Sequence, residues 1–526
     1  MFSFYRFSTY EEKTQNWPMD TKKKIPKGKG FVTSDFFSTD FGSIIEQLFV
    51  TSDGFAVLLN EFDSWFLRRD PNGGDPLLCV AVDHNHFPYH RYYKEDYFHI
   101  EFRIMAARNV REAHQTVMKQ PGWIPKPTSI PDANLFTSPI WSTWAVYHKK
   151  INQSTVLEFA QQVKKHDFPV AQIEIDDLWE KHYGDFTFDV AKFPNATKLV
   201  EDIRALGYPT TLWVYPFVNS DSAAFNESAP HLTRNSKGQL AGVTWWDGVG
   251  GIIDFSTLSA ADWFVGRLKK LQAETKIHSF KFDAGEVGWY GSDFNFTDSF
   301  VGENPSLMTL RYVFACARMG GSIEVRSAYR TQNVPVFVRM LDKNSHWGLD
   351  NGLKSLITTA LTMSLGGYSF ILPDMIGGNA YGRHPSEELY IRWVQANALL
   401  PAMQFSIPPW AYSQSTVNLT KRFLELHKHH SATFIALAKR VQHGEPIIRP
   451  MWYAAPEDAR SFTIADQFMV GEDLLVAPVV EENQRQRSVF FPSGTWVDQH
   501  GKSYNGLSVA TVLAPLEELP YFTRKH

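Results

Sequence analysis

Residues 196–217 read ATKLVEDIRALGYPTTLWVYPF, and they contain one complete unit of the alternation that decides the fold. Residues 196–206 are predicted to form a helix that ends near Gly207, and residues 210–217 are predicted to form a strand. The same alternation continues from about residue 137 to residue 441. Because a strand followed by a crossover helix returns parallel to its neighbour, the pattern predicts parallel strands.

Eight such units over roughly 310 residues fit a (β/α)8 barrel with insertions better than an open sheet. Short β-rich runs flank them on both sides, and the turn residues Asn72-Gly73-Gly74 separate some of the N-terminal runs. We therefore expect an α/β protein with three domains. These are an N-terminal β-sandwich at residues 1–130, a catalytic (β/α)8 TIM barrel at 131–442 and a C-terminal β-sandwich at 443–526.

The composition excludes several classes of protein. The chain has 526 residues with 52 Lys+Arg and 56 Asp+Glu, a net charge of −4, which argues against nucleic acid as a partner. Its two cysteines cannot build a disulfide framework or a Cys-rich metal site. The 16 Trp, 20 Tyr and 40 Phe can fill a core or line a sugar-binding cleft, and composition does not choose between these.

Targeting signals are weak. The first residues lack the apolar run of a signal peptide. The longest uncharged run, residues 355–373, contains several Thr and Ser and a Gly pair, which favours a buried helix followed by a turn and a strand over a membrane span. Five glycosylation sequons favour a secretory compartment, although chance alone would give a few. They begin at Asn152, Asn195, Asn226, Asn295 and Asn418.

Acidic residues follow several predicted barrel strands, where the catalytic residues of such barrels lie. They are Asp176, Asp177, Asp283, Asp342 and Asp374. Two carboxyl groups of this kind can cleave a glycosidic bond, one as the nucleophile and one as the acid. A Mg²⁺ or Ca²⁺ site is the alternative, but no His accompanies these residues at ligand spacing, so we expect no metal. No phosphate-binding glycine motif follows a strand, so we expect no nucleotide cofactor.

These motifs resemble family 31 of the glycoside hydrolases. Asp283 lies in Lys281-Phe-Asp-Ala-Gly-Glu286, which matches the nucleophile motif of the family, and Asp342 begins Asp-Lys-Asn-Ser-His-Trp347, which matches the acid/base motif. Arg326 precedes Asp342 by 16 residues, the spacing of the substrate-binding Arg of the family. The resemblance implies a retaining α-glycosidase with Asp283 as the nucleophile and Asp342 as the general acid and base.

The resemblance also implies a set of sugar-binding residues. They are Trp144, Asp176, Asp177, Trp246, Lys281, Arg326 and Asp374. Asp374 and Arg326 each have a structural alternative, as a buried carboxylate and a buried salt bridge, and Trp245 and Trp410 are further candidates for sugar contact. Lys281 is expected to keep Asp283 ionised, because residues two apart on a strand share a face. Burial is expected to raise the pKa of Asp342 so that it can donate a proton.

Two departures bear on the substrate. Family α-glucosidases carry Trp where Lys281 stands, and a sugar-binding His where Gln404-Phe405-Ser406 stands. Several segments instead resemble an animal member of the family, which implies an α-galactosidase acting on galactose linked to glucose. It also implies a homodimer in the lumen of the secretory pathway, with a membrane anchor that this chain does not show. An α-xylosidase, an α-glucosidase and a catalytically inactive sugar-binding or signalling protein are the alternatives.

Overall fold

The computed structural model describes most of the chain. The described residues are 4–8, 31–32, 44–59, 66–70, 77–81, 101–290, 294–298, 301, 304, 306–349 and 351–526. The predicted turn at Asn72-Gly73-Gly74 lies outside them.

Eight parallel strands form the centre of the molecule, in the order β19-β18-β17-β15-β10-β9-β8-β20. A parallel bridge between Met375 and Gln404 joins the two edges and closes the sheet. The predicted (β/α)8 barrel is therefore confirmed. The strands are β8 (Ile140–Ser142), β9 (Gln172–Ile175), β10 (Thr210–Val214), β15 (Ser279–Phe282), β17 (Glu324–Val325), β18 (Phe337–Arg339), β19 (Ile371–Leu372) and β20 (Gln404–Phe405).

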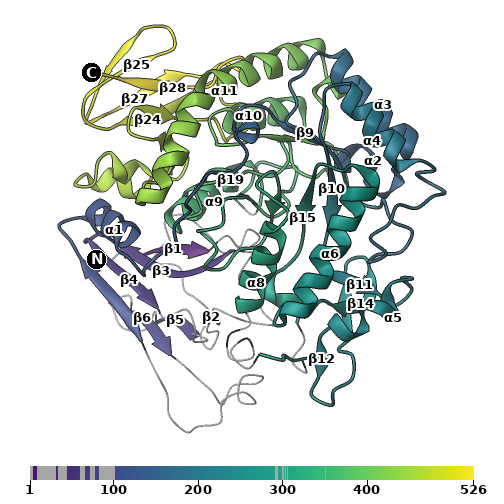
Figure 1. The fold of residues 1–526 in the computed structure, drawn as a ribbon. Helices are drawn as coiled ribbons and strands as arrows, with labels where there is room; N and C mark the ends of the chain where they lie inside the picture. Colours follow the sequence, from purple (N-terminus) through teal and green to yellow (C-terminus); the bar gives the residue numbers. More distant parts are fainter. Residues whose placement is uncertain are drawn as a thin grey trace.

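Helices cover the outside of the barrel (Figure 1). They are α3 (Gln153–Lys165), α4 (Ala196–Ala205), α6 (Leu258–Thr275), α8 (Ser306–Ala317), α9 (Leu353–Leu365), α10 (Glu387–Ala398) and α11 (Gln414–Arg440). Residues 326–336, all of them described, contain no helix and run directly from β17 to β18. The N-terminal domain packs there instead: Ile44 pairs with Ala328, and the Arg330 amide donates to Glu46 Oε1 at 2.8 Å.

A small antiparallel sheet is inserted between β10 and α6. It consists of β11 (Phe217–Asn219), β14 (Gly248–Ile252) and β13 (Val243–Trp245). Residues 251–255 lie within the alternation at 137–441, yet they form no barrel strand. Residues 250–252 pair antiparallel with β11, because the chain turns back immediately after Trp246 and Asp247. The β13–β14 turn thereby carries these two side chains to the mouth of the barrel.

Two β-rich units, purple and yellow in Figure 1, lie beside the barrel. The N-terminal sheets have the orders β1-β3-β4-β7 and β2-β5-β6, and the C-terminal sheets β21-β22-β23-β28-β25-β26 and β24-β27. The N-terminal elements are β1 (Phe4–Ser8), β2 (Phe31–Val32), β3 (Ile45–Thr51), β4 (Phe55–Leu59), β5 (Phe66–Asp70), β6 (Leu77–Ala81), β7 (Phe102–Ala106) and α1 (Val110–Lys119). The C-terminal strands are β21 (Ile448–Arg449), β22 (Phe468–Val470), β23 (Leu474–Val476), β24 (Gln486–Phe491), β25 (Thr495–Asp498), β26 (Ser503–Asn505), β27 (Ser508–Leu513) and β28 (Tyr521–Lys525).

The uncharged run at residues 355–373 folds as predicted. It forms most of α9, whose residues are almost all buried, and then β19. Searching the described residues reveals no helix that combines the length and apolar character needed to cross a membrane.

One buried guanidinium joins the barrel to the C-terminal domain. Arg392 on α10 donates to the backbone carbonyls of Pro515 and Glu518 at 3.2 and 3.3 Å, and to those of Gln484 and Ala514 at 2.8 Å each. Arg392 is inaccessible to solvent, so its guanidinium depends on protein acceptors such as these carbonyls for its hydrogen bonds.

We therefore expect Arg392→Met to lower the free energy of unfolding by about 2–4 kcal/mol, because four backbone carbonyls lose the donor that a buried guanidinium supplies. Urea denaturation measures this. Arg318→Ala is the control, because Arg318 makes a half-exposed ion pair with Asp262 and its loss should change stability by about 0–1 kcal/mol. Equal stability of Arg392→Met and wild type would refute the role of Arg392.

Candidate active site

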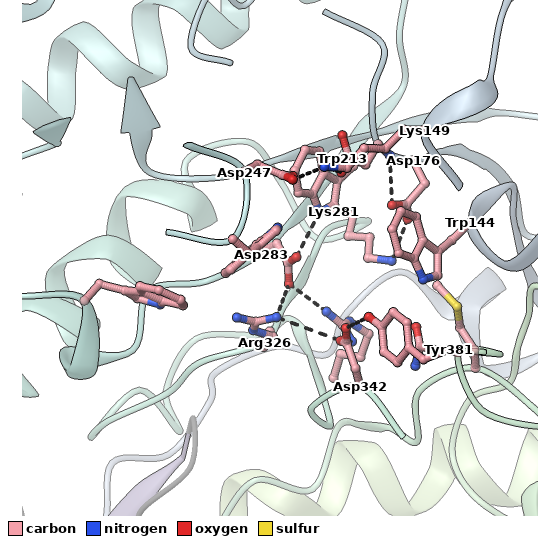
Figure 2. A pocket seen from close by; sticks show the side chains of 16 residues that line it. Trp144, Lys149, Asp176, Trp213, Asp247, Lys281, Asp283, Arg326, Asp342 and Tyr381 are labelled. Atoms are coloured by element: carbon pink, nitrogen blue, oxygen red, sulfur yellow. Dashed lines mark hydrogen bonds and ion pairs between the residues drawn. The ribbon is translucent and has the colours of Figure 1, made fainter. Parts of the chain in front are cut away.

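A cavity of about 480 Å³ opens at the carboxyl ends of the barrel strands. Eight of the nine predicted catalytic and sugar-binding residues line it (Figure 2): Trp144, Asp176, Asp177, Trp246, Lys281, Asp283, Arg326 and Asp342. The other lining residues are Lys149, Trp213, Asp247, Trp289, Arg339, Met375, Asn379 and Tyr381. Barrel closure thus brings together side chains from most of the chain.

Asp283 stands directly after β15 and extends its ladder, since its amide donates to the Val214 carbonyl at 2.8 Å. Its Oδ2 accepts from Trp213 Nε1 at 2.9 Å. Its Oδ1 accepts from Arg339 Nη2 at 2.8 Å and lies 3.1 Å from Arg326 Nη1. These contacts fix the orientation of the carboxylate and place two cations beside it.

The chain turns sharply after Asp283. Gly285 has φ +92°, and a Cβ there would lie 2.4 Å from both Ser327 Oγ and the Tyr312 ring. Tyr312 also donates from its hydroxyl to the Asp283 carbonyl at 2.8 Å. A glycine is therefore required two residues after the carboxylate, as in the motif.

Asp342 lies in the loop after β18. Its Oδ2 accepts from the Tyr381 hydroxyl at 2.5 Å, and its Oδ1 accepts from Arg339 Nη1 at 3.0 Å. Burial alone would raise the pKa of Asp342, but the charges of Arg339 and Arg326 outweigh it and hold this pKa below its usual range. The expectation of a raised pKa is therefore wrong, because the sequence did not reveal the second arginine.

The two carboxyl groups lie close together. Arg326 Nη1 is 3.1 Å from Asp283 Oδ1 and 3.9 Å from Asp342 Oδ1, so these two oxygens are within about 7 Å of each other. Figure 2 shows both contacts as dashed lines. Retaining glycosidases place their carboxyl groups roughly 5–5.5 Å apart and inverting ones roughly 6.5–9.5 Å. The upper limit of 7 Å excludes most of the inverting range.

Lys281 does not pair with Asp283. Its Nζ lies 2.9 Å from Glu174 Oε1 and 2.9 Å from Asp176 Oδ2, and all three side chains are buried. Burial would lower the pKa of Lys281, but Asp176 and Glu174 outweigh it and raise this pKa. The predicted role of Lys281 is therefore corrected: two arginines hold Asp283, and Lys281 neutralises a carboxylate pair that β9 contributes.

Arg326 is held from two sides. Its Nε donates to Glu286 Oε1 at 2.6 Å, and its guanidinium lies 5.1 Å from the centroid of the Trp246 ring. Glu286 in turn accepts from Trp289 Nε1 at 2.7 Å. The motif residue Glu286 therefore orients Arg326, and Trp246, with 44% of its surface exposed, forms part of the cavity rim.

Three other candidates lie away from the cavity. Asp374 is fully buried behind Arg339, where it accepts from Arg339 Nη1 at 3.0 Å and from the Lys343 amide at 2.7 Å. This placement favours its structural alternative over sugar contact. Trp245 packs beneath Trp246, and Trp410 stacks on His166 at 4.7 Å between centroids.

Sequence reasoning missed Lys149, Trp213, Asp247, Arg339 and Tyr381. One signal was available for Arg339: an arginine inside the apolar run Val-Phe-Val-Arg-Met-Leu must find buried carboxylates. The others come from loops or from a neighbouring strand, and no local spacing marks them.

The sequon residues lie outside the cavity. Asn195, Asn226, Asn295 and Asn418 are exposed. Asn152 is half-buried, and its Oδ1 caps α3 by accepting from the Ser154 and Thr155 amides at 3.0 and 3.1 Å. Within the described ranges, no three His, Cys, Asp or Glu side chains are grouped so that they could hold a metal ion.

Comparisons with known proteins agree with this geometry. The model of the glycosyl hydrolases family 31 TIM-barrel domain matches residues 135–429, and the model of the family 31 C-terminal domain matches residues 444–526. The myogenesis-regulating glycosidase of Mus musculus is 37% identical over 98% of this chain and 73% of its own length. The SITS-binding protein of Tetronarce californica is 28% identical over 92% of this chain and 69% of its own.

Solved structures share the fold. A family 31 α-xylosidase from a soil metagenome, complexed with xylose, superposes with a TM-score of 0.79 at 20% identity. The match covers 100% of this chain and 78% of that one.

The Lys281 contacts give a stability prediction. Lys281→Met leaves Glu174 and Asp176 buried without their cation, and we expect it to lower the free energy of unfolding by about 3–5 kcal/mol. The double variant Lys281→Met/Glu174→Gln should recover part of this loss, because one of the two carboxylates is then neutral. Urea denaturation of both variants is the measurement, and a double variant less stable than the single one would contradict the assignment.

Proposed function

This chain belongs to family 31 of the glycosyl hydrolases, and on that premise we propose that it is a retaining α-glycosidase that removes a terminal α-linked galactose. The observation that carries the proposal is the carboxyl pair. Asp283 and Asp342 face one cavity within about 7 Å of each other, each held by the same two arginines. A catalytically inactive protein need not keep this arrangement.

In the first step, Asp283 attacks the anomeric carbon from the face opposite the leaving oxygen, and Asp342 gives that oxygen a proton. The C–O bond to the leaving group breaks as the ester to Asp283 forms. This ester has the β configuration. Trp213 and Arg339 keep the attacking carboxylate oriented, which reduces the reorganisation required in the transition state.

The shared arginines couple the two carboxyl groups. When Asp283 becomes an ester it loses its negative charge, and Arg326 and Arg339 then act more strongly on Asp342. The ionised form of Asp342 is thereby favoured once its proton has moved to the leaving group. In the second step ionised Asp342 takes a proton from water, which attacks the anomeric carbon and releases the sugar with net retention.

The charges of the cavity favour a neutral sugar. Five acidic side chains line it, Asp176, Asp177, Asp247, Asp283 and Asp342, against four cations, Lys149, Lys281, Arg326 and Arg339. Each of these cations is already ion-paired with a carboxylate. A sulfonated or carboxylated sugar would therefore find no surplus cation.

Support for galactose comes from the replaced residues. Gln404 is buried and donates from Nε2 to Glu174 Oε2 at 3.2 Å, so no imidazole from this position reaches the sugar. α-Xylosidase is the alternative specificity on the same fold. We also propose that the protein is a membrane-anchored homodimer in the lumen of the endoplasmic reticulum or Golgi; the exposed sequons support the lumenal location.

A non-catalytic sugar-binding protein is the second candidate, because one relative is named as a binding protein. The intact Asp283 and Asp342 pair favours the enzyme.

A panel of 4-nitrophenyl α-glycosides tests the proposal. We expect cleavage of the α-galactoside, and a fall in kcat on the order of 10⁴-fold in Asp283→Asn, because the amide cannot form the ester. Asp262→Asn, which alters an exposed ion pair with Arg318, is the control and should keep full activity. Failure to cleave any glycoside, or unchanged cleavage by Asp283→Asn, would refute the proposed glycosidase activity. Preference for the α-glucoside or α-xyloside would refute only the proposed specificity for galactose.

The pH profile tests the role of Asp342. The alkaline limb of kcat/KM reports ionisation of the acid in the free enzyme. Because the arginines hold the pKa of Asp342 low, we expect an optimum on the acid side of neutrality. Tyr381→Phe removes a donor to ionised Asp342, so the pKa of Asp342 should rise and the alkaline limb should move to higher pH. If the alkaline limb of the Tyr381→Phe profile does not move, a group other than Asp342 governs that limb.

A further inference from the structure

Three charged side chains that the catalytic steps do not use meet on one wall of the cavity. Lys149 comes from the short 3-10 helix η3 (His148–Lys150), Asp177 follows β9, and Asp247 lies in the β13–β14 turn. The Lys149 ammonium forms ion pairs with Asp247 Oδ1 and, at 3.8 Å, with Asp177 Oδ2. All three side chains line the cavity. We call Lys149, Asp177 and Asp247 the wall cluster.

The wall cluster is buried but incompletely satisfied. The carboxyl groups of Asp177 and Asp247 are only 3% and 2% exposed. Asp177 Oδ1 accepts from the Tyr183 hydroxyl at 2.8 Å. Asp247 Oδ2 is buried and makes no hydrogen bond of normal geometry with a described residue, although the side chains of Asp177 and Tyr183 lie next to Asp247. A buried carboxylate oxygen without a donor is unfavourable, so this atom requires a donor on a bound molecule or a proton on Asp177.

The position of the wall cluster indicates which part of a bound sugar it would contact. No hydrogen bond or ion pair of the described residues joins it to Asp283 or Asp342, and Figure 2 shows Lys149 and Asp247 across the cavity from Asp342. Asp283 and Asp342 must face the anomeric carbon. The wall cluster therefore faces the far end of the ring, where the 4-hydroxyl and the 6-hydroxymethyl group of a hexose lie.

We propose that Lys149, Asp177 and Asp247 recognise the hydroxyl groups at the far end of a neutral hexose and so determine which sugar the cavity accepts. This inference rests on the proposed function. A hydroxyl both donates and accepts, and the wall cluster presents an acceptor at Asp247 beside a donor at Lys149. A structural ion pair that only ties the β13–β14 turn to the barrel would need neither exposure to the cavity nor an unsatisfied oxygen.

Asp177 gives the wall cluster a second hydrogen-bond donor besides Lys149. Burial and the neighbouring Asp247 raise the pKa of Asp177 to about 9, although Lys149 and Tyr183 oppose this. The ionisable groups around Asp177 are Lys149 on η3, Tyr183 and Lys192 in the loop after β9, Tyr215 after β10, Asp247 in the β13–β14 turn and the adjacent Asp176. At neutral pH Asp177 therefore keeps its proton and can donate it in a hydrogen bond.

The first experiment measures sugar selectivity. Asp247→Asn should lower kcat/KM for the 4-nitrophenyl α-galactoside by about 10–100-fold, the usual effect of losing a charged hydrogen-bond acceptor. The α-xyloside lacks the hydroxymethyl group and differs at the 4-hydroxyl, so its kcat/KM should fall less than about threefold. Asp177→Asn keeps a neutral donor at this position, so its kcat/KM for the α-galactoside should fall less than that of Asp247→Asn.

Asp221→Asn is the matched control, since Asp221 is an exposed carboxylate paired with His182. Equal losses of Asp247→Asn on both substrates would overturn the inference, because a purely structural role lowers activity without changing selectivity. Asp177→Asn with a loss as large as that of Asp247→Asn would overturn the donor role of Asp177.

Binding without turnover separates this inference from the proposed function. Free galactose and free xylose should raise the thermal midpoint of wild type to different extents, and Asp247→Asn should reduce that difference. If this pattern holds while no glycoside is cleaved, the proposed function is refuted and sugar recognition by the wall cluster is supported. If wild type cleaves the galactoside but Asp247→Asn changes neither selectivity nor binding, sugar recognition by the wall cluster is refuted and the proposed glycosidase activity is supported. If neither sugar raises the thermal midpoint and no glycoside is cleaved, both the proposed function and sugar recognition by the wall cluster are refuted.

The protonation of Asp177 has its own readout. Because its folded-state pKa is raised, the folded protein binds a proton that the unfolded chain releases above about pH 4, so this residue makes stability fall as pH rises towards 9. Asp177→Asn should lose less stability than wild type between pH 5 and 9 in urea denaturation. If the stabilities of wild type and Asp177→Asn depend on pH in parallel, Asp177 does not keep its proton at neutral pH, and this part of the inference is refuted.

Discussion

The arginine at the end of β18 organises the centre of the barrel. Arg339 is 1% exposed and pairs with four carboxylates, Asp283, Asp342, Asp374 and Glu324, at 2.8–3.2 Å. A buried guanidinium requires such partners, and the carboxylates would repel one another without it. One strand residue therefore positions the carboxyl groups of the proposed nucleophile and the proposed acid, and it also links their charges. The low pKa of Asp342 follows in part from this contact.

Where the chain departs from a regular barrel, it builds other parts of the site. The direct connection from β17 to β18 leaves room for the N-terminal domain, which contacts Ala328 close to Arg326. The sheet inserted after β10 brings Trp246 and Asp247 to the mouth of the cavity. The regular strands thus provide the reaction chemistry, and the insertion provides groups that can distinguish sugars.

The sequence predicted the barrel, the carboxylates at its strand ends and half of the residues that line the cavity. It succeeded because an acid after an apolar strand is a local signal, as at Asp283 and Asp342. It failed for contacts across the barrel. Lys281 and Asp283 share a strand face, yet Lys281 reaches past β10 to Glu174 and Asp176 on the β9 side, and only closure of the sheet brings them together. The antiparallel pairing of β14 was equally hidden, because a short apolar run does not reveal its partner strand.

The central claim is that Asp283 forms a covalent bond to the sugar. A 5-fluoro-α-galactosyl fluoride carries a good leaving group, and its ring fluorine slows breakdown of the ester. After incubation with it, mass spectrometry of the intact chain and of its peptides should show one added 5-fluorogalactosyl group, located on the peptide that contains Asp283 and absent from Asp283→Asn. Turnover of the fluoride with no adduct and with the β-anomer as first product would contradict the account, as would an adduct on another carboxylate.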